Sequence, residues 1–330
     1  MTTRIQSGVK AIVFPLLSMF LLFCMAGCIW ETNSTPPSKT ITPTTVKQDA
    51  PIRTLGIIYP MAHPFYEMIT RFAEEAAKAY PVQLIVKAPD EANLEQQIRI
   101  METMIKQGVD GIAIDPVDAD ALSPVINKAV QAGIPVVCFE SDSPQSNRLA
   151  FIGTNNIQAG ARMGKVIDEL LNGRGMILVE TGMSKMKSLS ERLEGMLDYI
   201  NTQTAIQVLE VRYNEGNDTQ ALSDLETMID AHPHFDAFVA LDFVSGSTSI
   251  LVWKAKGLNR YAITYGMMPE IKEAIQNGQI TSAVSQNEQK WGSRIVDLLY
   301  QASQGTKIPV YDDTGTVEIT INNVESLDLQ

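Results

Sequence analysis

The chain has few of the residues on which many reactive or cross-linked sites depend. Its 330 residues include 3 histidines and 3 cysteines. Cys138 is the one cysteine after position 28, so residues 29–330 can form no internal disulfide. Cys138 lies within an apolar run, which is typical of a small core residue. His232 and His234 flank a proline without cysteine or acidic ligand spacing nearby, so no metal site is predicted.

Basic residues are also in deficit, because 26 Lys and Arg stand against 38 Asp and Glu, for a formal net charge of -12. A nucleic-acid surface requires clustered Lys and Arg, so no nucleic-acid partner is expected. The sequence has no G-x-x-x-x-G-K-[S/T] loop and no G-x-G-x-x-G after the first predicted strand. Gly182-Met183-Ser184 does not have the G-x-S-x-G form. An enzyme is therefore disfavoured, and no cofactor is expected.

The N-terminus has the pattern of an export signal. Arg4 and Lys10 precede a short apolar run, which is followed by the sequence Met-Ala-Gly-Cys ending at Cys28. This pattern predicts a secretory signal over residues 1–28, too short to span a bilayer as a mature helix. The last four residues resemble the lipobox of bacterial lipoproteins, with Met25 where Leu is usual. The resemblance implies that Cys28 is lipidated; a cleaved signal with an unlipidated Cys28 is the alternative.

Residues 29–52 are dominated by Thr, Ser, Pro and Lys. Such a segment has too little apolar surface to offset its ordering entropy, which predicts a disordered tether. A lipid followed by a tether indicates an extracytoplasmic body anchored to a bacterial membrane, at the periplasm or the cell surface. The remaining body has about 280 residues, which suits two domains of ordinary size. No transmembrane segment is predicted after Cys28.

Short apolar segments alternate with amphipathic ones along the body. The predicted strands are 54–59, 82–86, 111–114, 134–139, 149–152, 176–180, 206–211, 236–241, 261–265, 279–284 and 316–321. The predicted helices are 65–80, 94–107, 119–132, 157–171, 187–202, 219–231, 247–256, 269–277 and 289–303. Short apolar strands separated by helices favour parallel sheets with helices on both faces. The pattern restarts near residue 157, so the predicted fold is α/β with two similar lobes.

Four segments, in order along the chain, resemble one protein family. They are YPMAHPFY (59–66, like a strand followed by N-P-F-F/Y), GIAIDPVDADA (111–121, like G-I-I-I-x-P-x-D-x-x-A), AGIPVV (132–137) and SERLEG (190–195, like the R-x-x-G-F region). The chain from Arg53 onward resembles the type 1 periplasmic binding proteins of the ribose- and galactose-binding kind. Each segment alone is weakly specific, and their order and spacing carry the resemblance.

The resemblance implies two Rossmann-like, doubly wound lobes joined by a three-stranded hinge, with a ligand cleft between them. One lobe would comprise residues 53–153 plus 287–313, and the other residues 154–286 plus 314–330. Ligand would bind at the carboxyl ends of the strands, where open α/β sheets usually bind. The implied function is capture of a small sugar or polyol by lobe closure. A monomer would then deliver it to the membrane permease of an ABC transporter.

Five candidate ligand-binding residues belong to the first implied lobe. Phe65 and Tyr66 follow the first strand and would offer aromatic faces to a sugar. His63 stands where the family has Asn and can both donate and accept hydrogen bonds. Glu140 follows the strand that contains Cys138, at the family's acidic position, and Asp142 is a further candidate. A carboxylate suits this role because charge-assisted hydrogen bonds to hydroxyls are strong.

Four further candidates belong to the second implied lobe, namely Arg192, Asn217, Asp242 and Gln286. Arg192 matches the family's arginine, whose fork of donors suits two adjacent hydroxyls. Two departures argue against ribose as the ligand. Ser141 stands where the ribose binders carry Arg, and the stretch 266–268 reads Gly-Met-Met where they carry Asp.

The excess of carboxylates over Arg192 favours a neutral or weakly cationic ligand, because buried negative charges repel an anion. A ligand sensor that feeds a two-component kinase or a chemoreceptor is the main alternative function. The sensor and the transport protein would share every residue named above. A repressor of the related family would need an N-terminal DNA-binding module, where this chain has its signal.

Overall fold

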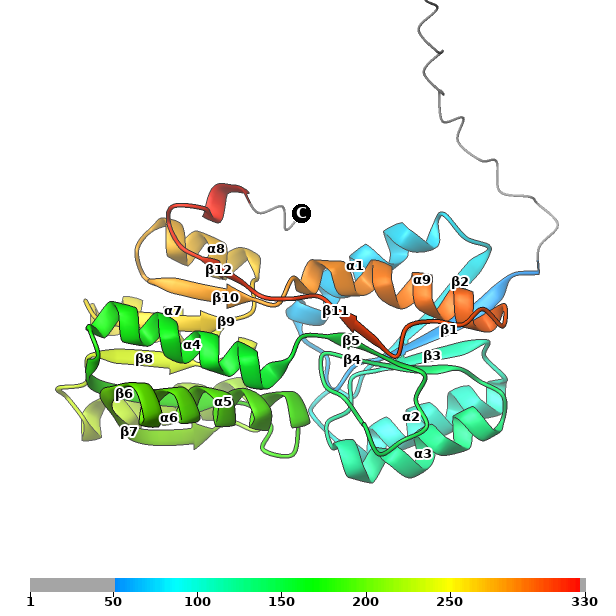
Figure 1. Ribbon diagram of the computed structural model, residues 1–330, viewed down its shortest axis with the longest axis horizontal. Coiled ribbons are helices and arrows are strands. Elements are labelled where there is room, and N and C mark those ends of the chain that lie inside the picture. Colours follow the sequence, from blue (N-terminus) through cyan, green and yellow to red (C-terminus); the bar gives the residue numbers. More distant parts are fainter. Residues whose placement is uncertain (1–50, 327–330) are drawn as a thin grey trace, which may run out of the picture. The chain divides into compact units, whose positions relative to one another are not determined.

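The computed structural model describes residues 51–326, and the signal, Cys28 and most of the expected tether lie outside them. The described residues form two six-stranded sheets with helices on both faces of each (Figure 1). In the first sheet the strand order is β11-β5-β4-β3-β1-β2. Its strands are β1 (Arg53–Ile58), β2 (Val82–Lys87), β3 (Gly111–Ile114), β4 (Val136–Phe139), β5 (Ala150–Gly153) and β11 (Tyr311–Asp313).

The second sheet has the strand order β12-β10-β9-β8-β6-β7. Its strands are β6 (Arg174–Thr181), β7 (Ala205–Tyr213), β8 (Ala237–Ala240), β9 (Tyr261–Tyr265), β10 (Ser282–Ser285) and β12 (Val317–Ile319). Neighbouring strands in both sheets run parallel, except that β12 pairs with β10 in the antiparallel direction. The chain passes between the sheets after β5, after β10 and after β11, and Figure 1 shows the last passage as the segment that joins β11 to β12.

The helices cover the two faces of each sheet. Helices α1 (Pro64–Ala77) and α9 (Trp291–Ser303) pack on one face of the first sheet, and α2 (Leu94–Gln107) and α3 (Ala119–Gln131) pack on the other. In the second sheet, α4 (Asn156–Leu171) and α5 (Lys187–Gln203) cover one face. The opposite face carries α6 (Asp218–Ala231), α7 (Phe243–Lys256) and α8 (Pro269–Gln276). Short 3-10 turns at Glu288–Lys290 and Val324–Ser326 complete the described elements.

Local sequence signals explain why the helices begin and end where they do. Helix α2 starts after Asn93, whose side chain accepts the amide hydrogen of Gln96, and it stops at Gly108, which adopts a left-handed conformation with φ of 67°. A helix end that needs positive φ favours glycine because glycine has no Cβ to clash. Helix α7 is capped by Asp242, which accepts from the amides of Val244 and Ser245.

The two-lobed α/β fold predicted from the sequence is confirmed, with bounds shifted by a few residues in several elements and with two larger differences. Helix α7 begins at Phe243 rather than at Ser247, because the cap at Asp242 adds a turn that the apolar spacing does not reveal. Strand β11 was not predicted, since Tyr-Asp-Asp has no apolar alternation and is held as a strand by pairing with β5. Within residues 51–326, no helix has the length and apolarity needed to cross a membrane.

Candidate functional site

A buried acidic pair lies at the carboxyl ends of β3 and β4. Asp115 follows β3 and Glu140 follows β4, and their exposed fractions are 0% and 3%. The hydroxyl of Tyr66, on α1, donates to Oδ2 of Asp115 at 3.0 Å and lies 3.3 Å from Oε2 of Glu140. The amide of Ser141 donates to Oδ1 of Asp115 at 3.2 Å. The adjacent parallel strands β3 and β4 therefore bring the two carboxyl groups together, and α1 adds the hydroxyl of Tyr66.

Burial dominates the protonation of this pair. It raises the pKa of Asp115 well above its usual range, and the neighbouring charge of Glu140 raises that pKa further. Burial also raises the pKa of Glu140, while a hydrogen bond with Asp115 and the charge of Arg192 oppose the rise. Ionisation of both buried carboxyl groups is unfavourable because the two negative charges would repel each other, so the groups titrate as a pair.

The backbone at Glu140 is unusual, because φ is 56° at a residue that is not glycine. A left-handed conformation at such a residue costs on the order of 1–3 kcal/mol and is found where the surrounding structure enforces it. The amide of Glu140 donates to the carbonyl of Ile152, and the amide of Ser141 donates to the carbonyl of Phe139. These bonds hold the turn that presents the Glu140 carboxyl group beside Asp115.

Aromatic side chains from both lobes meet next to this pair. The ring of Phe65, on α1, stacks on Phe243, the first residue of α7, with centroids 4.7 Å apart and planes 9° apart. His63 caps α1 by accepting the amide hydrogen of Phe65, and its ring lies 4.6 Å from that of Phe243. Burial lowers the pKa of His63. Phe65 and His63, both predicted from the sequence, thus contact an aromatic residue that was not predicted.

Arg192 is buried in the second lobe, with an exposed fraction of 1%. Its guanidinium donates to the carbonyl of Leu241 at 2.6 Å and to Oδ1 of Asn156 at 2.9 Å. The same group lies 3.6 Å from the centroid of the Tyr265 ring, a cation–π contact. The hydroxyl of Tyr265 donates to Oε1 of Gln286 at 3.2 Å. Arg192 and Gln286 are therefore held on a shared aromatic support.

Asp242 lies at the carboxyl end of β8, with an exposed fraction of 4%. Besides capping α7, it bonds to the hydroxyl of Ser245 and lies 3.4 Å from the side-chain amide of Asn214. Burial raises the pKa of Asp242, and these hydrogen bonds oppose the rise. Its carboxyl group is therefore positioned by Ser245 on α7 and by Asn214 in the loop after β7.

The structure does not bring two of the candidates into this group. Asp142 pairs with Arg148 through two contacts of 2.6 Å, so its carboxylate is already engaged. Asn217 is exposed and caps α6 by accepting the amide hydrogen of Gln220. The buried asparagine beside Asp242 is Asn214 instead.

Several polar atoms at this place have no protein partner although they are buried. Among the described residues, these atoms include Nε of Arg192 and Oγ of Ser188. The amide of Ser188 donates to Oγ of Ser141 at 3.2 Å, a contact that joins α5 to the turn after β4. An unpartnered buried donor is costly in a native protein, and a polar ligand would remove that cost.

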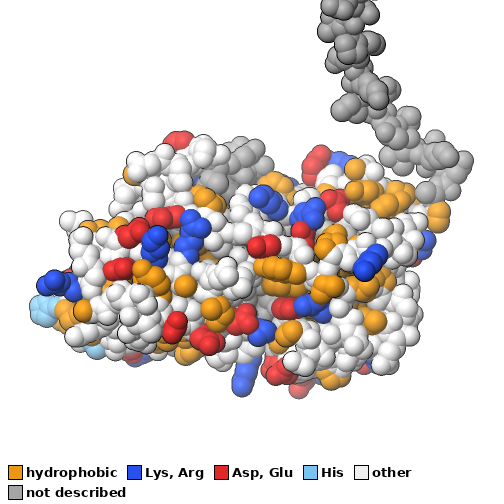
Figure 2. All heavy atoms as spheres, viewed as in Figure 1, with side chains coloured by type: hydrophobic (Ala, Val, Ile, Leu, Met, Phe, Trp, Pro, Cys, Tyr) orange, Lys and Arg blue, Asp and Glu red, His pale blue; other side chains and the backbone are white. Residues whose placement is uncertain are grey.

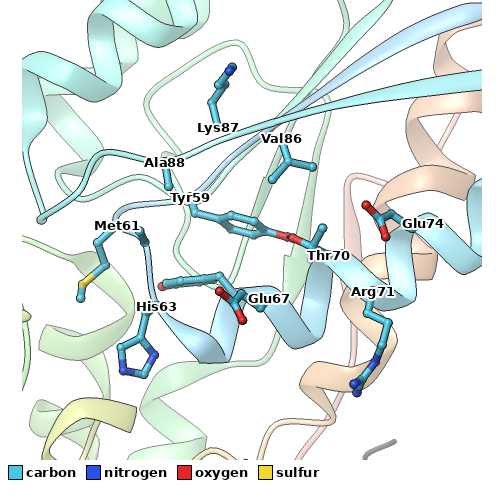
Figure 3. Close-up of a pocket in the computed structure, with 12 residues that line it drawn as sticks. Tyr59, Met61, His63, Glu67, Thr70, Arg71, Glu74, Val86, Lys87 and Ala88 are labelled. Atoms are coloured by element: carbon cyan, nitrogen blue, oxygen red, sulfur yellow. The ribbon is translucent and has the colours of Figure 1, made fainter.

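A cavity of about 500 Å³ opens beside α1 at the carboxyl ends of β1 and β2 (Figure 3). Its lining includes His63 and Tyr66 as well as Tyr59, whose hydroxyl lies 2.9 Å from Oγ1 of Thr70. The ring of Tyr59 stacks on that of Tyr66 with centroids 4.7 Å apart. The cavity therefore lies next to the aromatic rings of Tyr59 and Tyr66.

Sequence reasoning missed four residues of this group, namely Asp115, Asn214, Phe243 and Tyr265. Asp115 follows a predicted strand just as Glu140 does, and this position was the available signal. Phe243 directly follows Asp242 but was hidden by the later predicted start of its helix. No pattern in the sequence marked Asn214 or Tyr265 as neighbours of Asp242 and Arg192.

Comparison with known proteins identifies the class. Residues 57–307 match the model of a family described as periplasmic binding protein domain. The D-ribose/D-allose-binding protein of Pseudomonas aeruginosa is 24% identical, over 76% of this chain and 83% of its own length. The ribose import binding protein of Bacillus subtilis is 22% identical, over 77% and 83%.

A solved structure of a solute-binding protein is also similar to this chain. The ABC transporter solute-binding protein from Burkholderia graminis, in complex with D-arabinose, has a TM-score of 0.81 and 29% identity, covering 85% of this chain and 99% of that chain. The chain belongs to the periplasmic binding protein family, type 1, as the resemblance in its sequence implied. These relatives are binding proteins rather than enzymes, which agrees with the prediction from the missing motifs.

Proposed function

We propose that this protein is an extracytoplasmic, lipid-anchored solute-binding protein. It captures a small sugar or polyol by closure of its two lobes and delivers it to the permease of an ABC transporter. The unpartnered buried Nε of Arg192 is the observation that carries the proposal, because this guanidinium of the second lobe acts electrostatically on Glu140 of the first. The sugars named for the relatives support a carbohydrate ligand.

Ligand recognition divides between charged and aromatic groups. Glu140, Arg192, Asp242 and Gln286 supply hydrogen bonds to hydroxyls, and Phe65, Tyr66 and Phe243 supply faces for the C–H surfaces of a sugar ring. Asp142 and Asn217, which are engaged elsewhere, contribute less. Because ligand bonds to both lobes at once, it stabilises the closed state by its differential affinity for that state.

The lobes in this proposal comprise residues 53–153 plus 287–313 and residues 154–286 plus 314–330. The passages after β5, β10 and β11 act as the hinge strands. Residues 1–28 are the lipoprotein signal, and residues 29–52 form the tether. On the face shown in Figure 2, Lys and Arg side chains lie among Asp and Glu rather than in one basic patch, which supports the absence of a nucleic-acid partner.

A thermal-shift screen against sugars, polyols, amino acids and nucleosides tests the proposal. Free ligand at about 100 times its dissociation constant stabilises the folded state by roughly 2.7 kcal/mol. A carbohydrate hit that is lost in Glu140→Gln, and retained in Glu226→Gln on the exposed face of α6, supports the assigned site. A hit confined to amino acids or nucleosides overturns the carbohydrate assignment.

Transport and sensing are separated by a growth assay. Deletion of the gene abolishes growth on the identified sugar if the protein feeds a permease. If it feeds a sensor kinase instead, uptake persists and only the transcriptional response to the sugar is lost. The anchor is tested by Cys28→Ser, which moves the protein from the membrane fraction to the soluble fraction if Cys28 carries the lipid.

A further inference from the structure

Among the described residues, no cationic side chain forms an ion pair with Asp115 or Glu140, although the charge of Arg192 acts on Glu140 from a distance. The nearest guanidinium, Arg192, donates to the carbonyl of Leu241 and to Asn156 rather than to either carboxyl group. The groups that hydrogen-bond to the pair are the Tyr66 hydroxyl, the Ser141 amide and the side chain of Gln286, which are all neutral. Two carboxyl groups in this position need a proton or another positive charge between them.

A metal ion is not favoured as that positive charge. In residues 51–326 no group of three or more His, Cys, Asp or Glu side chains is arranged to hold a metal. The carboxyl oxygens already accept hydrogen bonds from a hydroxyl and an amide, and the same oxygens can accept from an organic donor. An ammonium group has three donors and one positive charge, so it satisfies two carboxylates at once.

The surroundings of the site are acidic as well. Asp218 and Glu270, on α6 and α8 of the second lobe, and Glu67 on α1 each act electrostatically on His63, where the lobes meet. These carboxylates raise the local concentration of a cationic ligand near His63. The unpartnered Oγ of Ser188 adjoins the turn of Ser141, so hydrogen-bonding capacity remains for the hydroxyls of the same ligand.

We infer that the site prefers an amine-bearing sugar or cyclitol over its neutral counterpart, with the ligand ammonium taking the place of the proton shared by Asp115 and Glu140. This inference rests on the proposed function and names its substrate class. On binding, the shared proton passes to the buffer, and the ammonium hydrogens bond to both carboxylates. A neutral sugar binds the same site with the proton retained.

Titration calorimetry on the full-length chain tests this inference. The probes are D-glucosamine, D-galactosamine and an aminodeoxyinositol, each compared with D-glucose, D-galactose and myo-inositol. We expect one amine to bind at least tenfold more tightly than its neutral parent. Experiments in two buffers of different ionisation enthalpy should then show release of a proton on binding, and the dissociation constant of the amine should fall as the pH rises from 5.5 to 7.

Other titratable groups lie around the pair, and most of them keep their charge between pH 5.5 and 7. Those that face it or act on it are Tyr59, Tyr66, Cys138, Arg192 and Tyr265. Burial raises the pKa of each of the three tyrosines and of Cys138, so none of them ionises between pH 5.5 and 7. Arginine stays charged throughout this range. Asp242 and its neighbour Glu180 are the other buried carboxyl groups near the site with a raised pKa, so Asp115→Asn is needed to assign the released proton to the pair.

Asp115→Asn keeps the shape of the side chain and removes one of the two carboxylates. We expect it to lose the preference for the amine and the proton release while it still binds the neutral parent. Glu226→Gln, which removes an equal charge on the exposed face of α6, should retain both. If Asp115→Asn does not fold, the number of protons that the unaltered protein releases on binding the amine still tests the inference.

The outcomes separate this inference from the proposed function. Neutral sugars that bind as tightly as the amines, or amines that bind without releasing a proton, overturn the inference and leave a sugar-binding protein. Binding of neither class overturns both the inference and the proposed function.

Discussion

Phe65 and Phe243 stack face to face across the two lobes, with ring centroids 4.7 Å apart and planes 9° apart. Phe65 belongs to α1, which packs on the first sheet, and Phe243 begins α7, which packs on the second. Through this stack, the buried apolar cluster continues from the helices of one lobe to those of the other. The contact between the two lobes therefore includes an aromatic stack as well as the hydrogen bond between Ser188 and Ser141.

We expect Phe243→Leu to lower the affinity for the sugar about tenfold, which corresponds to about 1.4 kcal/mol. Leucine retains most of the apolar volume but lacks the flat face that stacks on Phe65 and on a sugar ring. Calorimetric titration with the sugar found in the screen measures the change. Phe238→Leu is the matched control, because Phe238 is buried in β8 against Trp253. An equal loss of affinity in both variants would contradict a ligand contact at Phe243.

Arg192→Lys should destabilise the protein by about 2 kcal/mol even without ligand. The guanidinium satisfies the Leu241 carbonyl and Asn156 together, and an ammonium on a flexible stem cannot reproduce that fork. Urea denaturation measures the free energy of unfolding. Arg294→Lys alters a more exposed fork on Asp312 and should cost less than about 1 kcal/mol. A similar cost for both substitutions would show that burial of Arg192 does not matter.

Most of the fold was predictable from the sequence, because apolar strands and amphipathic helices carry their period in the residues themselves. Helix α2 illustrates this, since Leu94–Gln107 was predicted with the bounds that the structure has, including the stop at Gly108. Strand β11 was not predictable, because its residues are polar and its conformation depends on pairing with β5, which lies far away in the chain. Tertiary pairing overrides local preference in such segments.

The candidate site was predictable only in part. Residues that directly follow strands, such as Glu140 and Asp242, can be found because parallel strands collect their carboxyl ends at one edge. Asp142 also follows β4, yet it points to Arg148, and no sequence period distinguishes it from Glu140. The difference arises at the turn, where Glu140 adopts positive φ and directs its side chain inward.

Two substitutions at Asp242 should separate its structural role from its binding role. Asp242→Ala removes the cap of α7 and should reduce stability by about 1–2 kcal/mol. Asp242→Asn retains a capping oxygen and should change stability by less than about 0.5 kcal/mol. Both should weaken sugar binding, because the charge-assisted bond to a hydroxyl is lost. Normal affinity in Asp242→Asn would mean that Asp242 only caps the helix.

Glu180 gives the protein a pH dependence that is separate from ligand binding. This residue of β6 is buried, and both of its carboxyl oxygens lack a hydrogen-bond partner. Burial, followed by the charge of Asp242, raises the pKa of Glu180 to about 9. In the unfolded chain a glutamate ionises near its ordinary pKa of about 4.3. Between these values the folded state binds more protons than the unfolded state, so stability falls as pH rises.

We expect the free energy of unfolding to decrease from pH 5 to pH 9, by at most about 1.4 kcal/mol per pH unit from this group. Urea denaturation at intervals of one pH unit measures the slope. Glu180→Gln holds the neutral form at every pH, so its curve should be flatter and should lie above that of the unaltered protein at pH 8. Glu226→Gln, an exposed substitution in the same lobe, should leave the slope unchanged. A slope that persists undiminished in Glu180→Gln would assign the pH dependence to other buried carboxyl groups, such as Asp242.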